Sequence, residues 1–328
     1  MLDNIVVVES VEFESHMLME SVGKIRFGNA SSTYTNEDEL IKLIEDADAI
    51  VITSRGKFSK RVISAASKLK IIAKCGALPN NVDINAATDL GIPVTWTPGS
   101  NAGSVAEHAV TLMLSILKLV PKTMDGLKKG RWHTEQDKAN ELMGKTVGIV
   151  GFGQAGSYLT KFLKPYDVEM LVFDPYVSQE KIDLYGVKKV DLKTLLSNSD
   201  IVTLHCHMCE ETHHLINKER LAVMKKSAFL VNTARGGLID EDALYEALSN
   251  KWIAGAGLDV FEVEPASKDN PLFNLDNILI TPHMAGWTKE ALVREARGAS
   301  EEVIRVLTGE LPKNLVNPGF AISNKNNN

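Results

Sequence analysis

The chain has 328 residues, of which 44% are hydrophobic and 24% charged, and its formal net charge is -6. That length allows two domains of ordinary size, and the composition is that of a globular protein with hydrophobic cores. The acidic balance and the absence of a long basic run argue against nucleic acid as a partner. No apolar stretch reaches membrane-spanning length without a charge, so we expect no membrane association.

The N-terminal sequence and the cysteines bear on the compartment. The first ten residues, MLDNIVVVES, have neither the basic region nor the cleavage site of a secretory signal. The three cysteines, Cys75, Cys206 and Cys209, do not make a disulfide framework. We therefore expect a cytoplasmic protein.

The first hundred residues alternate between strand and helix signals. β-branched runs predict strands at 4–8, 49–53, 71–74 and 92–96, and apolar spacing predicts helices at 36–45, 60–69 and 84–90. This alternation is typical of a doubly wound α/β domain.

A long apolar helix is predicted next, from Ser104 to Val120. Ser104 and Glu107 have capping-box spacing, which favours Ser104 as the N-cap. Apolar residues occupy nearly the whole circumference, so the helix should be buried on most faces. Its place in the chain fits either a domain or dimer interface or a plain core helix.

The segment from Lys145 to Asp174 has the pattern of a dinucleotide-binding βαβ unit. A strand-like run precedes GFGQAG, in which Gly151, Gly153 and Gly156 match G-x-G-x-x-G, and a second strand-like run ends on Asp174. The helix N-terminus after the glycines would bind phosphates. Asp174 can accept both ribose hydroxyls and would repel a 2′-phosphate, so we expect NAD rather than NADP.

Further strands are predicted near 200–204, 228–232, 254–258 and 278–280, followed by a long helix at 288–307. Because the nucleotide unit begins almost halfway along, we expect two doubly wound domains. A Rossmann NAD-binding domain (101–287) is inserted into a flavodoxin-like substrate domain (1–100 plus 288–328). The active site is expected in the cleft between them.

Three later segments end strands on residues suited to chemistry. They are LVNTARGG with Arg235, GLDVFEVEP with Asp259 and Glu264, and ILITPHMAG with His283. Arginine can bind a carboxylate bidentately, and a glutamate beside a histidine raises the histidine pKa, which suits acid–base work. Each residue alone is more often structural, but together beside a nucleotide site they favour catalysis.

These motifs, with GIPVTWTPGSNAGSVAEH at 91–108, resemble the D-isomer-specific 2-hydroxyacid dehydrogenases from about residue 40 to 318. That family includes phosphoglycerate, glyoxylate/hydroxypyruvate and D-lactate dehydrogenases. The resemblance implies that Arg235 binds the substrate carboxylate and carbonyl, His283 is the acid/base, and Glu264 tunes His283. It also implies a homodimer formed through the helix that contains Ser104.

The resemblance places two sets of binding residues. The expected cofactor contacts are Gly151, Gly153, Gln154, Ala155, Gly156, Asp174, His205, Thr233, Ala234, Arg235, Asp259, His283, Ala285 and Gly286. The expected substrate contacts are Gly76, Ala77, Leu78, Arg235 and His283.

The substrate loop departs from the family pattern. The family usually has G-x-G-x-D-N, whereas residues 76–81 read GALPNN, with Leu78 in place of glycine and Asn80 in place of aspartate. The leucine would narrow or reshape the pocket. Thr53 and Lys74 stand where phosphoglycerate enzymes often carry arginines, so a phosphorylated substrate is not indicated. Arg55 and Lys57 are close by in the sequence and keep that alternative open. The regulatory domain of longer phosphoglycerate dehydrogenases is expected to be absent.

Residues 205–214, HCHMCEETHH, offer Cys206 and Cys209 at C-x-x-C spacing and four histidines. Without a second cluster, this segment is more typical of a loop beside the cofactor than of a zinc site, and we expect no metal.

The sequence thus predicts an NAD-dependent oxidoreductase that interconverts a 2-keto acid and a D-2-hydroxy acid. One alternative is D-3-phosphoglycerate dehydrogenase of serine biosynthesis. Formate dehydrogenases also resemble the family, but they usually pair the histidine with glutamine. An alternative of another class is an NAD(H)-sensing, corepressor-like binding protein.

Overall fold

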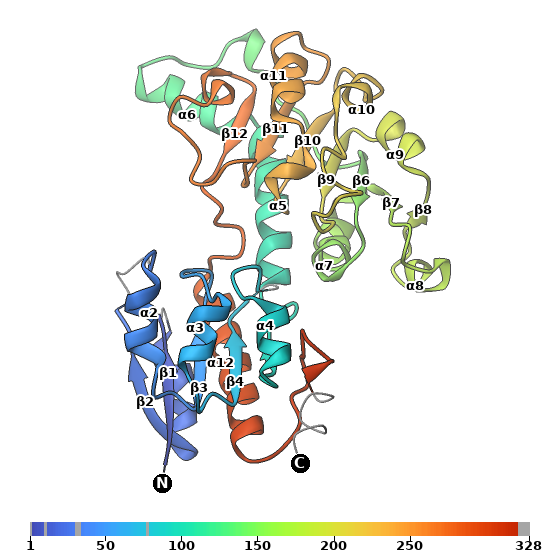
Figure 1. Ribbon diagram of the computed structural model, residues 1–328. Coiled ribbons are helices and arrows are strands. Elements are labelled where there is room, and N and C mark those ends of the chain that lie inside the picture. Colours follow the sequence, from blue (N-terminus) through green and yellow to red (C-terminus); the bar gives the residue numbers. More distant parts are fainter. Residues whose placement is uncertain (1, 10–11, 30–33, 77–78, 321–328) are drawn as a thin grey trace. The chain divides into compact units, whose positions relative to one another are not determined.

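The structure, a computed structural model, describes residues 2–9, 12–29, 34–76 and 79–320 (Figure 1). The chain divides into two compact units. The first comprises Met1–Asn101 together with Thr288–Asn328, and the second comprises Ala102–Trp287. In sequence, the second unit therefore lies inside the first.

The first unit contains a parallel sheet of five strands in the order β2-β1-β3-β4-β5. This is the flavodoxin-like order. Its strands are β1 (Asp3–Val7), β2 (Gly23–Phe27), β3 (Ala49–Ile52), β4 (Ile71–Lys74) and β5 (Val94–Thr95). Its helices are α1 (Phe13–His16), a 3-10 turn (Met17–Ser21), α2 (Glu37–Ile44), α3 (Lys60–Ala65), α4 (Ile84–Asp89) and α12 (Lys289–Leu307).

Helices cover both faces of this sheet because successive strand residues point to opposite sides. Val6 and Val8 pack into a core with Leu40 and Ile44 of α2. Ile5 and Val7 pack into a second core with Ala299 and Val303 of α12. The last helix of the chain thus covers one face of the first sheet.

The second unit contains a parallel sheet of seven strands in the order β12-β11-β10-β9-β6-β7-β8. Its strands are β6 (Thr146–Val150), β7 (Glu169–Phe173), β8 (Lys188–Lys189), β9 (Ile201–Leu204), β10 (Phe229–Asn232), β11 (Gly255–Leu258) and β12 (Ile278–Ile280). The order changes direction at β6, as in a Rossmann fold, so the predicted α/β class with a Rossmann unit is confirmed.

The helices of the second unit also cover both sheet faces. They are α5 (Ala102–Leu117), α6 (Val120–Lys128), α7 (Gln154–Leu163), α8 (Gln179–Asp183), α9 (Leu192–Asn198), α10 (Lys218–Ala222) and α11 (Glu241–Ser249). The 3-10 turns are Glu135–Asp137, Lys164–Tyr166, Gly236–Leu238 and Pro271–Asn274. Leu112 of α5 and Leu159 of α7 share a core with Val231, while Leu196 of α9 and Leu244 of α11 pack with Leu230 on the other face.

The predicted helix from Ser104 to Val120 was wrong at both ends. It begins at Ala102, so Ser104 lies inside α5 and is not its N-cap. It ends at Leu117, because Leu119 adopts a left-handed φ of 53° and Pro121 stands in the first turn of α6. A proline in a continued helix would collide with the carbonyl four residues earlier.

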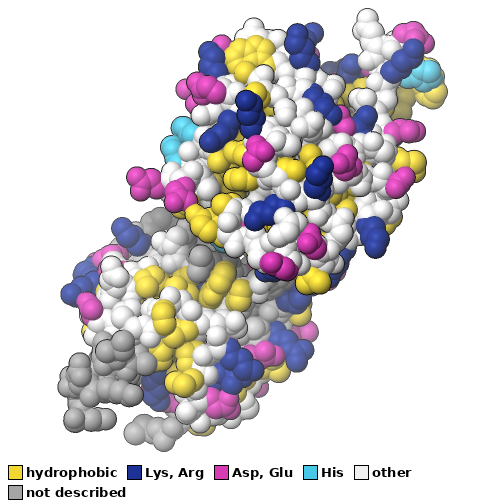
Figure 2. Space-filling model, turned by 90° about the vertical axis from the view of Figure 1, so that its right-hand side faces the viewer, with side chains coloured by type: hydrophobic (Ala, Val, Ile, Leu, Met, Phe, Trp, Pro, Cys, Tyr) yellow, Lys and Arg dark blue, Asp and Glu magenta, His cyan; other side chains and the backbone are white. Residues whose placement is uncertain are grey.

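Charges of both signs are mixed on the face of the molecule drawn in Figure 2. Figure 2 shows lysine, arginine, aspartate and glutamate side chains interspersed over one face. In the described ranges no single helix meets the length and apolarity needed to cross a bilayer, and only the bent pair of α5 and α6, counted together, does.

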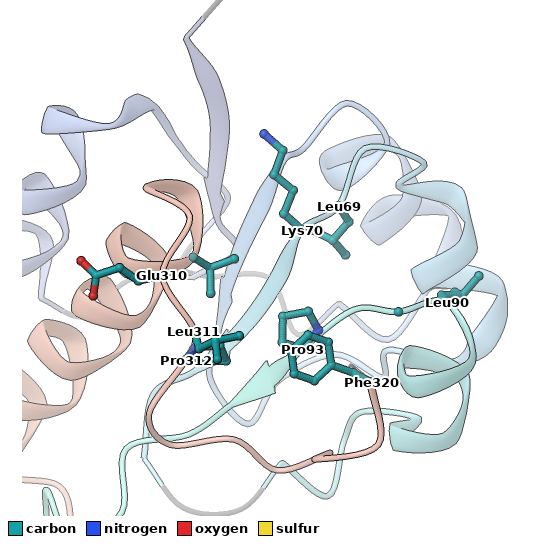
Figure 3. A pocket seen from close by; sticks show the side chains of 10 residues that line it. Leu69, Lys70, Leu90, Pro93, Glu310, Leu311, Pro312 and Phe320 are labelled. Atoms are coloured by element: carbon teal, nitrogen blue, oxygen red, sulfur yellow. The ribbon is translucent and has the colours of Figure 1, made fainter. Parts of the chain in front are cut away.

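The first unit has an open pocket of about 350 Å³. Leu69, Leu90, Pro93, Leu311 and Phe320 are among its lining residues (Figure 3). None of the residues expected in the active site lines it.

Asn317 ties the returning C-terminal segment to β5. Its buried side chain accepts the Val94 N–H at 2.7 Å and donates to the Ile92 carbonyl at 2.9 Å and to Thr88 Oγ1 at 3.1 Å. The Val316 N–H adds a backbone bond to the Val94 carbonyl at 2.7 Å. One amide therefore satisfies two buried backbone groups.

We expect Asn317→Ala to destabilise the first unit by about 2 kcal/mol, because it leaves a buried N–H and a buried carbonyl without this partner. Calorimetry should show a lower unfolding midpoint. Asn198→Ala, at an exposed position at the end of α9, is the control and should change stability by less than about 0.5 kcal/mol. Equal midpoints for the two variants would contradict the role given to Asn317.

Candidate active site

The glycine loop joins β6 to α7 and leaves space in front of the helix. Gly151 has a φ of +91°, and a Cβ there would lie 2.5 Å from the Cys206 backbone nitrogen. A Cβ at Gly156 would lie 2.4 Å from the Gly151 carbonyl oxygen, whereas one at Gly153 would meet nothing within 4 Å. Gly153 also has no side chain to cap the helix. The space beside Gly153, the N-cap of α7, is therefore open, as the predicted binding of a pyrophosphate at Gln154 and Ala155 requires.

Asp174, at the end of β7, is held beside this loop. Its Oδ2 accepts the Phe152 N–H at 2.8 Å, and its Oδ1 accepts the N–H groups of Tyr176 at 2.9 Å and Val177 at 3.1 Å. The Tyr176 hydroxyl donates to Glu211 Oε2 at 2.6 Å, which ties a second carboxylate to the same turn. A 2′-phosphate here would meet negative charge.

Two buried polar atoms along the next strands have no partner in the described part of the chain: His205 Nδ1 and Thr233 Oγ1. Leu204 pairs with Asn232, so the residues that follow these two leave the sheet side by side. The other ring nitrogen of His205 lies 2.9 Å from Thr203 Oγ1, and burial lowers the pKa of His205 to about 4. The neutral imidazole of His205 and the hydroxyl of Thr233 are therefore suited to hydrogen bonds with an uncharged polar group of a cofactor.

His283 and Glu264 come together at the carboxyl edge of the sheet. His283 Nδ1 lies 2.6 Å from Glu264 Oε2. Glu264 Oε1 accepts the Phe261 N–H at 3.0 Å, which orients the carboxylate. His283 has a left-handed φ of 51°, unusual for a residue with a side chain, and its side chain is half exposed. Its Nε2 is thereby left for a reacting group.

The contact between His283 and Glu264 shifts both of their pKa values from the ordinary ones, in opposite directions. The hydrogen bond to the Glu264 carboxylate raises the pKa of His283 above its ordinary value, against burial and the positive charge of Arg235. For Glu264, burial favours a higher pKa, but the bonds from His283 and the Phe261 N–H outweigh it and the pKa is lowered. The pair therefore favours the state in which the imidazole carries the proton and Glu264 is ionised.

Asp259 anchors the loop that carries His283. Its side chain is fully buried; Oδ1 accepts the Thr281 hydroxyl at 2.5 Å and the Met284 N–H at 2.9 Å, and Oδ2 accepts the Ala285 N–H at 2.8 Å. His108 Nε2, from α5, lies 3.4 Å from Oδ1. Sequence reasoning placed Asp259 at the cofactor, which stays a prediction, but missed the bonds to Thr281 and His108.

Arg235 follows β10 at the same edge. Its exposed guanidinium donates to the Ala234 carbonyl at 2.6 Å, and its charge lowers the pKa of both His283 and Glu264. The second unit thus brings together all three residues predicted to be catalytic. Their chemical roles stay predictions.

The expected substrate loop belongs to the first unit. Gly76 has a φ of +91°, and its N–H donates to Thr97 Oγ1 at 2.7 Å. Ala77 and Leu78 lie outside the described residues, so their predicted contacts stay predictions.

The side chains of residues 205–214 mostly have other partners. Cys209 Sγ lies 3.4 Å from Thr212 Oγ1, His214 Nε2 lies 2.8 Å from Glu262 Oε1, and His213 stacks on His214 with ring centres 3.9 Å apart. In the residues that the structure describes, no three His, Cys, Asp or Glu side chains form a group that could hold a metal.

Known proteins resemble this chain over most of its length. The D-3-phosphoglycerate dehydrogenase of Methanocaldococcus jannaschii is 40% identical over 314 residues, which are 95% of this chain and 59% of that protein. The chain thus spans less than two thirds of that relative. The hydroxypyruvate reductase of Thermotoga maritima is 40% identical over 279 residues, 84% of this chain and 90% of that protein.

A solved structure has the same fold. The D-lactate dehydrogenase of Aquifex aeolicus, complexed with NAD and lactic acid, matches with a TM-score of 0.82 and 28% identity, covering 95% of this chain and 99% of that one. Residues 110–285 match the family model for the NAD binding domain of D-isomer specific 2-hydroxyacid dehydrogenases. The chain therefore belongs to the D-isomer specific 2-hydroxyacid dehydrogenase family, with its NAD-binding domain in the second unit.

Proposed function

We propose that the protein is an NAD-dependent oxidoreductase that interconverts a 2-keto acid and a D-2-hydroxy acid. One observation carries the proposal: the 2.6 Å contact between His283 and Glu264, with Arg235 at the same sheet edge. A protonated histidine beside a cation suits a substrate that has both a carbonyl and a carboxylate. The D configuration of the product is supported by the family alone.

Each residue has a distinct part in the proposed reaction. Bound NADH would supply the hydride. The Arg235 guanidinium binds the substrate carboxylate and polarises the adjacent carbonyl. His283 donates its Nε2 proton to the carbonyl oxygen during reduction and accepts it back during oxidation. Glu264 stabilises the imidazolium and holds Nδ1, so that Nε2 faces the substrate.

The relatives named above leave open whether the substrate carries a phosphate. In the first unit, Lys74 is buried, and its Nζ donates to the Cys75 carbonyl at 2.9 Å and to Ser54 Oγ at 3.3 Å. A buried lysine held in this way is less suited to a phosphate than an arginine, whose guanidinium can bind a phosphate bidentately. We therefore favour a small, unphosphorylated 2-keto acid.

The proposal predicts turnover when purified protein is given NADH and a panel of glyoxylate, hydroxypyruvate, pyruvate and phosphohydroxypyruvate. NADPH should be the poorer cofactor, because Asp174 and Glu211 place negative charge where its extra phosphate would lie. His283→Ala should lower kcat by at least about a hundredfold while NADH still binds. Binding of NADH with no turnover of any acid would contradict the enzymatic proposal and favour a sensing role.

The His283–Glu264 pair predicts a specific pH dependence. Reduction needs protonated His283, so kcat/KM should fall as the pH rises through the pKa of His283, which Glu264 raises. Glu264→Gln removes that charge, lowers the pKa, and should shift the basic limb of the profile to lower pH. Oxidation needs a neutral imidazole, so kcat/KM for oxidation should rise as the pH rises through the same pKa. An unshifted profile in this variant would contradict the role of Glu264.

We also propose that the protein is a homodimer formed through α5 and α6. Val120, Met124 and Leu127 of α6 are exposed by 46%, 52% and 59%. Their spacing places them on one helix face, which is unusual for a surface that stays in water. Trp132, just beyond the helix, is 71% exposed.

We expect Met124→Glu combined with Leu127→Glu to convert the dimer into a monomer, because the substitutions bury charge in the apolar interface. Light scattering after size-exclusion chromatography would give the mass. Leu184→Glu is the control, since Leu184 is 85% exposed elsewhere in the second unit. A monomeric wild-type protein would refute the proposal, as would a double variant that stays dimeric.

A further inference from the structure

Two histidine–glutamate pairs share one short segment after β11. The segment Phe261–Glu264 contributes Glu264 to His283 at 2.6 Å and Glu262 to His214 at 2.8 Å. Phe261 is buried and packs edge-on against Phe273, with ring centres 5.3 Å apart. Val263 is 75% exposed. Beyond Phe261, the side chains of the two glutamates thus bind the segment to two histidines on other parts of the unit.

His214 also contacts the segment that carries Arg235. Its backbone N–H donates to the Gly237 carbonyl at 2.8 Å, two residues after Arg235. Its φ of 49° is left-handed, and its ring stacks on His213 at 3.9 Å. One residue thus bonds both to the segment of Arg235, through its backbone, and to the segment of Glu264, through its ring.

These two segments touch each other directly. A Cβ built on Gly236 would lie 1.9 Å from the Phe261 carbonyl carbon and 2.4 Å from the Glu262 nitrogen. The peptide between Phe261 and Glu262 therefore rests on the Gly236 backbone, next to Arg235. A shift of Glu262 would move Glu264 and change the separation between Arg235 and the His283–Glu264 pair.

Glu262 is fixed from a second side by the start of α11. The Glu262 N–H donates to Glu241 Oε1 at 2.6 Å, and the Glu241 N–H donates to Glu262 Oε1 at 3.2 Å. Asn270 donates to the other Glu241 oxygen at 2.9 Å. Glu262 Oε1 thus accepts hydrogen bonds from both the Glu241 N–H and the His214 ring. Among the described contacts, His214 is the one side chain other than that of Glu241 that bonds to Glu262.

We propose that His214 and Glu262 are positioning residues that clamp the Glu264 segment against the Arg235 segment and so set the geometry of the acid/base pair. The inference rests on the proposed function of Arg235, Glu264 and His283. Neither residue touches a reacting atom; both act through Glu264. Since the pair is about one third exposed on each side, it should contribute little to overall stability.

The clamp formed by His214 and Glu262 can be tested by measuring the pKa of His283. The charged groups that face His283 are Glu264, Arg235 and Asp259, and Glu264 acts most strongly. If the clamp is lost, the Glu264 contact loosens while Asp259 and Arg235 remain. The pKa of His283 should then fall toward its ordinary value. A residue that only supports the fold would not move this value.

The test compares His214→Phe, Glu262→Ala and His214→Gln. Phenylalanine keeps the ring stack but removes the donor, whereas glutamine keeps a nitrogen donor near the place of Nε2. We expect kcat for 2-keto acid reduction to fall roughly tenfold in the first two variants, with little change in KM for NADH or in the unfolding midpoint. NMR titration of the His283 imidazole should show a lower pKa in both, and His214→Gln should stay close to wild type.

The matched control is Glu246→Gln, which removes another ion pair of the second unit, Lys218 Nζ to Glu246 Oε2 at 2.6 Å. It should change neither kcat nor the pKa of His283. An unchanged His283 pKa in His214→Phe and Glu262→Ala would overturn the clamp, as would a His214→Gln variant as impaired as His214→Phe. If the wild type reduces no 2-keto acid, the proposed function fails, while the NMR titration still decides for or against the clamp.

Discussion

A fully buried carboxylate, that of Asp259, holds the candidate active site together. An ionised group without water must have its oxygens satisfied, and Asp259 achieves this with Thr281, Met284 and Ala285. All three belong to the segment that surrounds His283. The cost of burying the charge is offset only when this segment is in place, so the fold selects one conformation of the loop. The left-handed backbone at His283 is tolerated because these bonds over-determine it.

The parallel strands of the second unit bring the other site residues together. The carboxyl ends of β9, β10, β11 and β12 lie along one edge of the sheet, so residues far apart in the sequence leave it as neighbours. His205 follows β9, Thr233 and Arg235 follow β10, Asp259 follows β11, and His283 follows β12. At this edge Glu264 raises the pKa of His283, and the charges of His283 and Arg235 help to lower the pKa of Glu264. The candidate site therefore depends on the strand order, which places these residues next to one another at the sheet edge.

Much of this arrangement could be predicted because it follows short-range patterns. Apart from β8 (Lys188–Lys189), which was not predicted, the strands of the second unit were predicted to within a residue or two. Buried parallel strands are short apolar runs bounded by loops, whereas β8 consists of two lysines at the edge of the sheet. β2 was not predicted. In β2 (Gly23–Phe27), the charged residues Lys24 and Arg26 alternate with apolar ones, as is common in an edge strand. Such a segment has only a weak apolar pattern. The cap at Ser104 was wrong because a local pattern fits several helix starts, and packing selects one.

Contacts between loops could not be predicted from spacing at all. Residues 205–214 have the composition of a metal site, and nothing local shows that His214 reaches Glu262, 48 residues later. Nor does it show that one buried nitrogen of His205 has no partner among the residues that the structure describes. Those outcomes depend on the crossing of chain segments at the sheet edge. The roles of Arg235 and His283 were inferred from family resemblance together with their strand-end positions, because no local rule distinguishes them from surface residues.

The divided first unit has a consequence for synthesis on the ribosome. Its sheet face at Ile5, Val7 and Ile71 is covered by Ala299 and Val303 of α12, and β5 is bonded to Asn317. While residues 102–287 are being translated, at about 5–20 residues per second, this apolar face lacks α12, although Met19 of the 3-10 turn packs into the same cluster. The second unit, which is continuous in sequence, can complete its own core meanwhile. The nascent first unit is thus the part of the molecule exposed to misassembly and to chaperone binding until its last helix leaves the ribosome.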